Sequence, residues 1–456
     1  MTLAPDDYRT MTATALVAAY RAGTLSPVEA TEAALTVVEE RNPGLNAIFH
    51  LDAAGARAQA AASEARWRRG DPAGALDGVP TVVKDGLWMK GIPVYRGSIA
   101  LDRHAVVPTE DAPPVARMRE AGSVILGKTT MCDMGMFGSG YSSKFGPTRN
   151  PHDPAVTSGG SSSGTAAAIA SGMVPIAIGT DIVGSIRQPA AFCGLVGHKP
   201  SYGRVPTYPN SSPAAVAGPL ARSVADAALL LDTLVRPDAR DFACLAPDPN
   251  SYAWSLGGSV AGTRIGFLRS IGFGPTPDPQ SVAAVEKAVA RLAAIGCVVE
   301  EITSPFVPGD EKGGEDFYRM RPASELAALP EADRRAAEVI HAWSSPAAAY
   351  TGVHYHGLFM ATQSLRARAL AMIEGFDFLA LPTSATLPFA AELPGPEGHS
   401  TFAAWVNTFL FNLTEQPAIS LPCGKSKEGW PIGLQLVGRR FDDRGVLRLA
   451  AAWERG

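Results

Sequence analysis

The chain has 456 residues, of which 46% are hydrophobic and 18% charged, with a formal net charge of −4 at pH 7. This composition is typical of a globular protein and excludes the basic footprint that nucleic acid or an anionic membrane surface selects. We therefore expect neither a nucleic-acid nor a membrane partner.

The most apolar stretches, 166–178 and 225–235, are shorter than the roughly 20 residues that a membrane span requires. The first ten residues lack the basic and apolar regions of a secretory signal. The five cysteines are scattered and include no CxxC pair, which argues against a disulfide framework and a zinc site. These features favour a cytoplasmic location and predict no bound metal.

The N-terminal part, residues 10–69, is alanine-rich and helical in pattern, and Ser26-Pro27-Val28-Glu29 is typical of a capped helix start. Residues 78–83 then indicate a turn into a short buried strand. A helix over 113–121 and a strand over 123–127 follow, so strand and helix signals alternate.

The alternation continues to the end of the chain and favours an α/β fold in one domain, residues 1–456. Residues 304–410 form a helix-rich region with Pro and Gly breaks, which we expect to cover a site and line its substrate pocket. The remaining predicted helices are 166–172, 278–295, 304–375 and one from Arg444, and the remaining predicted strands are 174–178, 264–268, 297–302, 378–381, 418–421 and 433–437.

Two serine-bearing, glycine-rich turns lie around Ser161 and Ser185, and Lys84 directly follows the apolar run of 78–83. A serine needs a base to become a nucleophile, and no histidine lies close to either serine in the sequence. A buried lysine can lose its proton near neutral pH, because desolvation disfavours the charged amine. Tight glycine turns also present backbone N–H groups that stabilise an oxyanion. The alternative is a partly buried ion pair between Lys84 and Asp85 or another acid, with both turns serving only as connections.

Two other patterns are weaker. Residues 160–164 match the letters G-x-S-x-G, but that motif follows directly on an apolar strand, which 150–154 is not. His354 and His356 lie near each other without a third convincing ligand for a metal.

Longer motifs make the chain resemble the amidase signature family, including its bacterial aryl and alkyl amidases and its carbamate (urethane) hydrolases. The resemblance covers nearly the whole chain and is carried by residues 82–85, 145–151, 159–162, 184–187, 189–194 and 431–435.

The resemblance implies a central mixed, twisted β-sheet with helices on both faces. It also implies a catalytic triad in which Ser185 is the nucleophile, Ser161 lies beside a cis peptide bond, and Lys84 is the final base. The N–H groups of Ile182, Val183, Gly184 and Ser185 are implied to form the oxyanion hole, and groups near Met134 and Gly135 to meet the substrate.

Three positions depart from the family's usual pattern. Val183 and Ser163 stand where glycine is usual, and His198 stands where leucine is commoner. A positive φ at position 183 would strain a β-branched residue; otherwise Val183 narrows the pocket.

The predicted function is a serine hydrolase that cleaves amide-type C–N bonds of a small amide or carbamate, with esters as further substrates, through an acyl-enzyme and without a cofactor. The aromatic residues Phe402, Trp405 and Phe409 are candidates for contact with the substrate. We expect a monomer or homodimer. The alternative is the glutamine-hydrolysing A subunit of a tRNA-dependent amidotransferase; a non-catalytic scaffold is disfavoured because all three triad residues are present.

Overall fold

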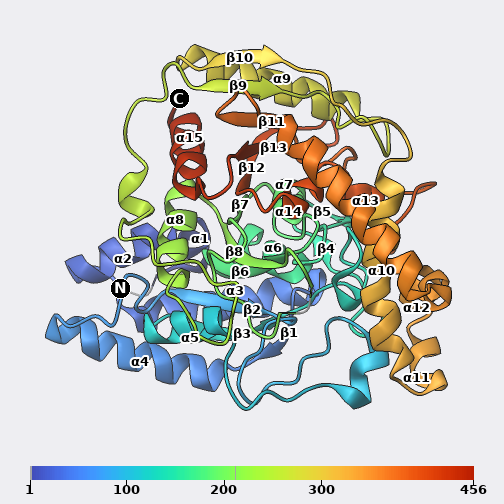
Figure 1. Cartoon of the computed structure of the whole chain (residues 1–456). Coiled ribbons are helices and arrows are strands. Elements are labelled where there is room, and N and C mark those ends of the chain that lie inside the picture. Colours follow the sequence, from blue (N-terminus) through green and yellow to red (C-terminus); the bar gives the residue numbers. More distant parts are fainter. Residues whose placement is uncertain (1–2, 211) are drawn as a thin grey trace.

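The computed structural model describes residues 3–210 and 212–456. Within these residues, one mixed sheet of eleven strands forms the centre of the molecule, and helices pack on both of its faces (Figure 1). In spatial order its strands are β1 (Ile48–Leu51), β3 (Val124–Thr129), β2 (Pro80–Lys84), β6 (Ile176–Asp181), β8 (Val216–Ala221), β7 (Val196–Lys199), β12 (Ala418–Lys425), β13 (Pro431–Gly438), β11 (Phe378–Pro382), β9 (Arg264–Phe267) and β10 (Val298–Glu301). A separate antiparallel pair consists of β4 (Arg149–Asn150) and β5 (Asp153–Thr157).

The α/β fold with a central mixed sheet is thus confirmed. The helices are α1 (Pro5–Thr10), α2 (Ala13–Ala22), α3 (Pro27–Leu45), α4 (Ala53–Arg69), α5 (Pro113–Glu120), α6 (Ser163–Ala170), α7 (Arg187–Cys193), α8 (Val224–Leu234), α9 (Pro279–Ala294), α10 (Glu311–Ala327), α11 (Glu331–Ala336), α12 (Glu338–Ser344), α13 (Gly352–Ala371), α14 (Leu410–Leu413) and α15 (Asp443–Arg455). The short 3-10 helices include η2 (Asp133–Gly135) and η5 (Ala403–Trp405).

Local sequence signals set several of these boundaries. Ser26 and Glu29 form a reciprocal capping box at the start of α3, where Pro27 takes the first helical position without losing a needed N–H. The helix predicted over 113–121 is α5, and Gly122 follows it with a φ of 78° that L-residues rarely adopt.

The prediction that residues 10–69 are helical is wrong at β1. Asn46 ends α3 in the left-handed conformation, and the next residues pair antiparallel with β3. Four residues carry too little periodicity to be distinguished from helix, so tertiary pairing decides their structure. The prediction also omitted β7 and β8, which are short and contain Gly or Pro.

The position of the candidate site follows from the middle of the sheet. Strand β2 lies between β3 and β6 and runs parallel to both. The carboxyl ends of β2 and β6 therefore meet at the same edge, where open α/β sheets commonly place their ligands. Lys84 is the last residue of β2, and Asp181 is the last residue of β6.

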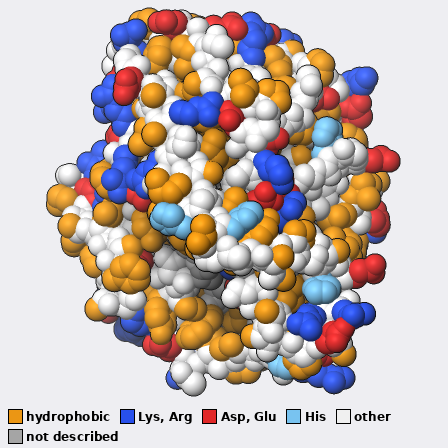
Figure 2. Space-filling view, turned by 45° about the vertical axis from the view of Figure 1, so that its right-hand side comes forward, with side chains coloured by type: hydrophobic (Ala, Val, Ile, Leu, Met, Phe, Trp, Pro, Cys, Tyr) orange, Lys and Arg blue, Asp and Glu red, His pale blue; other side chains and the backbone are white. Residues whose placement is uncertain are grey.

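Helices α10 to α13 lie together along one side of the molecule (Figure 1). Beneath them, a second hydrophobic cluster includes Phe402, Trp405 and Phe409 and extends to Val183 and Met134. Acidic and basic side chains are interspersed over the face that Figure 2 shows, with hydrophobic side chains between them. Among the helices of residues 3–210 and 212–456, none is both long and apolar enough to cross a membrane.

Candidate active site

Lys84 is completely buried at the carboxyl end of β2, whose five residues are all buried. Its Nζ lies 2.9 Å from Ser161 Oγ, 2.9 Å from Ser162 Oγ and 2.8 Å from Thr180 Oγ1. The alternative pairing with Asp85 is not what the structure shows, because Asp85 lies beside Lys128 with an Nζ–Oδ1 distance of 3.6 Å. The lysine amine therefore lies among hydroxyl groups.

Burial lowers the pKa of Lys84 to about 7, against an ordinary value of 10.5. Burial is the main cause of this shift and the guanidinium of Arg321 a minor one, while Cys132, Asp181 and Asp85 oppose it. An uncharged amine has two N–H donors and one lone pair, so it can accept the proton of a neighbouring hydroxyl. A lowered pKa and contact with a serine hydroxyl are the two properties that the predicted role of Lys84 as a base requires.

Ser161 lies in the turn between β5 and α6 and is 3% exposed. The Gly160–Ser161 peptide bond is cis. The N–H of Gly160 donates to Gln188 Oε1 at 2.8 Å, and the indole N–H of Trp405 donates to the carbonyl of Gly160 at 3.0 Å. These two contacts fix the backbone that presents the Ser161 hydroxyl to Lys84.

Ser185 lies in the turn between β6 and α7 and is 2% exposed. Its carbonyl accepts a hydrogen bond from the N–H of Ser162 at 3.2 Å, which joins the two serine turns. Its hydroxyl has no hydrogen-bond partner within residues 3–210 and 212–456, so no hydrogen bond joins Ser185 to Ser161 in this structure. Catalytic hydrogen bonds often form only when substrate is bound.

The backbone amides of the Ser185 turn differ in their availability. The N–H of Gly184 donates to Asp181 Oδ1 at 2.7 Å, so this amide is already engaged. Within the described part of the chain, the N–H groups of Ile182, Val183 and Ser185 have no acceptor. Three of the four amides implied to form the oxyanion hole therefore have an N–H group that is free to bind an oxyanion.

Val183 does not require the conformational freedom of glycine. The described residues with positive φ include Gly184, at 137°, but not Val183. A Cβ added to Gly184 would lie 2.1 Å from Thr408 Oγ1, whereas the Val183 side chain is buried in the apolar cluster. The strain considered for Val183 is thus absent.

An ion pair buried beneath the turn holds it in place. Arg187 donates from Nη2 to Asp181 Oδ1 at 2.9 Å and from Nε to Asp181 Oδ2 at 3.0 Å. Burial alone would raise the pKa of Asp181, but Arg187 outweighs burial and holds that pKa at about 2. The guanidinium also donates to Thr408 O, Asn412 Oδ1 and Gln435 Oε1. A charge-assisted network thus joins the Ser185 turn to the C-terminal strands.

Sequence reasoning missed this network and the role of Gln188. Arg187 and Gln435 lay within the family motifs, but nothing in their local spacing indicated a partner. Their separation of 248 residues explains why no local pattern could show the contact.

Met134 and Gly135 form part of η2, next to Ser161. A Cβ added to Gly135 would lie 3.4 Å from Ser161 Oγ, so this glycine borders the triad directly. The carbonyl of Met134 accepts hydrogen bonds from Arg321 Nη2 at 2.6 Å and Arg96 Nη2 at 3.2 Å. The carbonyl oxygen of Met134 is therefore already hydrogen-bonded within the protein, whereas Gly135 lies directly beside Ser161.

The aromatic residues Phe402, Trp405 and Phe409 are buried and pack against one another. Trp405 contacts the Ser161 turn through the carbonyl of Gly160 and also lies beside Gly184 in the Ser185 turn. His354, in contrast, lies on α13, where it stacks on Tyr350.

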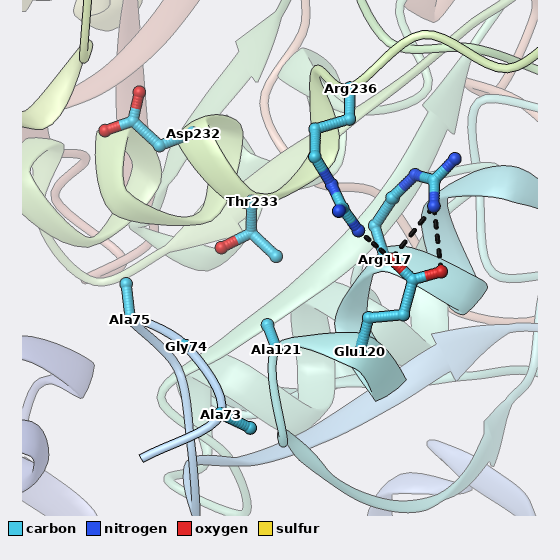
Figure 3. A pocket seen from close by; sticks show the side chains of 9 residues that line it. All are labelled: Ala73, Gly74, Ala75, Arg117, Glu120, Ala121, Asp232, Thr233 and Arg236. Carbon is cyan, nitrogen blue, oxygen red and sulfur yellow. Dashed lines mark hydrogen bonds and ion pairs between the residues drawn. The ribbon is translucent and has the colours of Figure 1, made fainter. Parts of the chain in front are cut away.

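A pocket of about 260 Å³ lies elsewhere, between residues 73–75, the end of α5 and the end of α8 (Figure 3). It contains none of the candidate residues described above. Its arginines, Arg117 and Arg236, both pair with Glu120, so its charges are largely compensated. The candidate catalytic residues therefore lie at the edge of the sheet where β2 and β6 end, and not in this pocket.

A family model described as Amidase matches residues 29–447. The A subunit of the glutamyl-tRNA(Gln) amidotransferase of Myxococcus xanthus (strain DK1622) is 36% identical over 472 residues, covering 96% of each chain. Among solved structures, a bacterial aryl acylamidase of the amidase signature family has a TM-score of 0.89 at 30% identity, covering 98% of this chain and 96% of its own. A 6-aminohexanoate cyclic dimer hydrolase has a TM-score of 0.87 at 30% identity, covering 98% and 97%.

Proposed function

Because this chain belongs to the amidase signature family of enzymes that act on amide C–N bonds, we propose that it hydrolyses small amides or carbamates through an acyl-enzyme on Ser185. The observation that carries the proposal is the buried Lys84 amine, with a pKa of about 7, at 2.9 Å from Ser161 Oγ.

In the proposed reaction, Ser185 Oγ attacks the carbonyl carbon while its proton passes to Ser161 and the Ser161 proton passes to Lys84. The free N–H groups of Ile182, Val183 and Ser185 bind the oxyanion, which is worth several kcal/mol in such sites (~3 kcal/mol per donor). Collapse of the intermediate breaks the C–N bond as Ser161 protonates the leaving amine and regains a proton from Lys84. Water then attacks the acyl group by the same relay and regenerates Ser185.

Hydrolysis of amides and carbamates is expected to need all three residues of this relay, whereas hydrolysis of simple esters is not. An amine leaves only when it is protonated, whereas an alcohol or phenol leaves far more readily without help. Esters are therefore expected as additional substrates, with less dependence on Ser161. The reaction as proposed needs no cofactor.

The second candidate is the glutamine-hydrolysing A subunit of a tRNA-dependent amidotransferase. The curated relatives that carry this name favour it, since they match along almost the full chain at 32–36% identity. The similar structures named above, an aryl acylamidase and a cyclic dimer hydrolase, favour the first candidate. Glutaminase activity that appears only with partner proteins of such a complex would select the second.

We further propose that residues 1–456 act as one domain, with 304–410 covering the site, as a monomer or homodimer. The single sheet supports one domain, because it joins strands from 48–51 to 431–438. The helices α10 to α13 then form the cover, while β11 of the same region belongs to the sheet.

The test of the proposed function is covalent labelling. Purified protein is treated with a fluorophosphonate, and the adduct is located by peptide mass spectrometry. We expect one adduct on Ser185, absent in Ser185→Ala, together with hydrolysis of members of a chromogenic panel of anilides, carbamates and esters. An adduct on another residue, or a Ser185→Ala variant with full activity, contradicts the proposal.

A further inference from the structure

Arg321 lies near the candidate site, and several of its hydrogen-bond donors have no acceptor within the described residues. It lies on α10, and its side chain is only 13% exposed. Its one hydrogen bond to the described residues runs from Nη2 to the carbonyl of Met134. Its Nε is buried and has no acceptor within residues 3–210 and 212–456. A guanidinium has five N–H donors, and leaving buried donors without partners is unfavourable.

The charges around Arg321 do not balance. Glu325 approaches Arg96 closely, with an Oε2–Nη1 distance of 2.5 Å, whereas its distance to Arg321 Nη1 is 3.6 Å. Two guanidinium groups thus share one carboxylate. Asp181 is already compensated by Arg187, and Asp85 by Lys128. Asp133, next to Met134, is a further buried carboxyl, but burial raises its pKa to about 7, and no ion pair joins it to Arg321 within the described residues. Arg321 therefore has only the shared Glu325 as a partner for its charge, and buried charges in folded proteins are normally paired.

This positive charge lies close to the reacting groups. Arg321 contacts Met134, the next residue is Gly135, and Gly135 borders Ser161 Oγ. The charge of Arg321 also acts on the Lys84 amine, since it contributes to that group's lowered pKa. A group bound by Arg321 would therefore lie beside the triad.

A role in holding the Met134 backbone does not by itself explain why a buried arginine is present at position 321. Arg96 already holds that residue at both ends, because its carbonyl accepts from the Met134 N–H at 2.7 Å and its Nη2 donates to the Met134 carbonyl at 3.2 Å. The Nε and Nη1 groups of Arg321 make no hydrogen bond within the described residues, and a planar anion can accept from two guanidinium donors at once.

We propose that Arg321 binds a carboxylate of the substrate, so that the enzyme prefers amides or carbamates carrying a carboxylate in the acyl or the amine part. This inference rests on the proposed function, because it assigns the substrate class of the same site. Arg321 is then a specificity-determining residue for the reaction at Ser185.

The binding test uses the Ser185→Ala protein, which cannot form an acyl-enzyme. Calorimetry compares malonamate, succinamate and glutaramate with the uncharged amides of matching length, propionamide, butyramide and valeramide. A second arm compares 4-acetamidobenzoate with 4-methylacetanilide, which places the carboxylate on the amine side instead. We expect at least one carboxylate ligand to bind at least tenfold more tightly than its uncharged partner.

Arg321→Gln in the same background should abolish that difference and leave binding of the uncharged ligand within threefold. The matched control is Arg319→Gln on the same helix, because Arg319 pairs with Glu315 and Asp316 instead. In the Ser185 enzyme at pH 9, Arg321→Gln should lower kcat/KM for the preferred carboxylate substrate at least tenfold more than kcat/KM for its uncharged analogue, because any effect through Lys84 acts on both substrates equally.

The inference is overturned if no carboxylate ligand gains tenfold, if the gain persists in Arg321→Gln, or if Arg321→Gln weakens both ligands equally. Equal weakening with an unchanged melting temperature would assign Arg321 a purely structural role. Failure of Ser185 labelling in the wild-type protein rejects the proposed function instead, and the calorimetry decides the carboxylate preference separately.

Discussion

Ser161 Oγ lies 2.9 Å from Lys84 Nζ, in a region where neither side chain is more than 3% exposed. Because burial places the pKa of Lys84 at about 7, the amine is protonated below that pH and has no lone pair to accept the serine proton. We expect kcat/KM to fall about tenfold per pH unit below pH 7 and to level off above it. Initial rates from pH 5 to 9, with circular dichroism as the control for folding, give this profile. A profile with its midpoint below pH 6 would contradict the assignment of Lys84 as the base.

Lys84→Met should abolish activity without lowering stability. The folded pKa of about 7 lies below the ordinary value of 10.5, so the unfolded chain binds more protons between these values, and native stability rises as the pH increases through this range. Removing the amine at pH 7 removes a cost of roughly 5 kcal/mol, at about 1.4 kcal/mol per pKa unit, partly offset by lost hydrogen bonds. We expect equal or higher stability in urea unfolding, with at least a thousandfold loss of kcat/KM.

Lys128→Met provides the matched comparison, because Lys128 is equally buried but pairs with Asp85. Its removal leaves a buried carboxylate without its cation, which costs about 3–5 kcal/mol. A Lys84→Met protein as unstable as Lys128→Met would show that Lys84 is mainly structural.

Ser161→Ala should separate amides from esters. The proposed relay gives Ser161 two tasks, moving the Ser185 proton and protonating the leaving amine, and the second matters little for a phenolate. We expect kcat/KM for an anilide to fall at least tenfold more than kcat/KM for the phenyl ester of the same acid. Parallel assays of the two substrates test this ratio, and equal losses would remove the leaving-group role from Ser161.

Arg187→Met should destabilise the protein by about 3–5 kcal/mol, because Asp181 would remain buried without its cation. The Ser185 turn should also lose its position, so activity falls with stability. Urea unfolding measures the first effect. Arg57→Met is the control, since the Arg57–Glu32 pair is exposed and surface pairs contribute about 0–1 kcal/mol. A loss below 1 kcal/mol in Arg187→Met would contradict the role given to this network.

Gly184→Ala and Val183→Ala should differ sharply. The added Cβ at Gly184 would collide with Thr408 Oγ1 at a φ of 137°, so we expect at least a hundredfold loss of activity. Val183→Ala removes only apolar volume, which costs about 1–2 kcal/mol and should leave kcat/KM within tenfold. Measurement of kcat/KM for both variants tests this difference. Greater activity loss at position 183 than at 184 would contradict the importance of the close approach between Gly184 and Thr408.

The sequence allowed the sheet to be predicted in large part because its buried strands are short apolar runs bounded by turn residues. Residues 78–83 and 433–437 are examples that the structure contains as β2 and β13. Strand β1 could not be predicted in this way, because its four residues adjoin long helical patterns on both sides. They are identified as a strand only by their pairing with β3.

The two serines and the lysine could be predicted as candidates because each stands in a recognisable local setting. Their support could not be predicted in the same way. The contact between Trp405 and Gly160 joins residues 245 positions apart, and Arg187 reaches Asn412 over 225 positions. Such contacts depend on the folded path of the chain, and no periodicity or turn motif encodes them.

The Arg187 network has a consequence for biosynthesis. The arginine that fixes the Ser185 turn finds its last partner, Gln435, 248 residues later in the chain. While a ribosome is still translating the intervening segment, the nascent polypeptide contains both serines and the lysine but lacks the strand that completes their support. The enzyme is therefore expected to stay inert toward cellular amides until β13, which contains Gln435, has been translated.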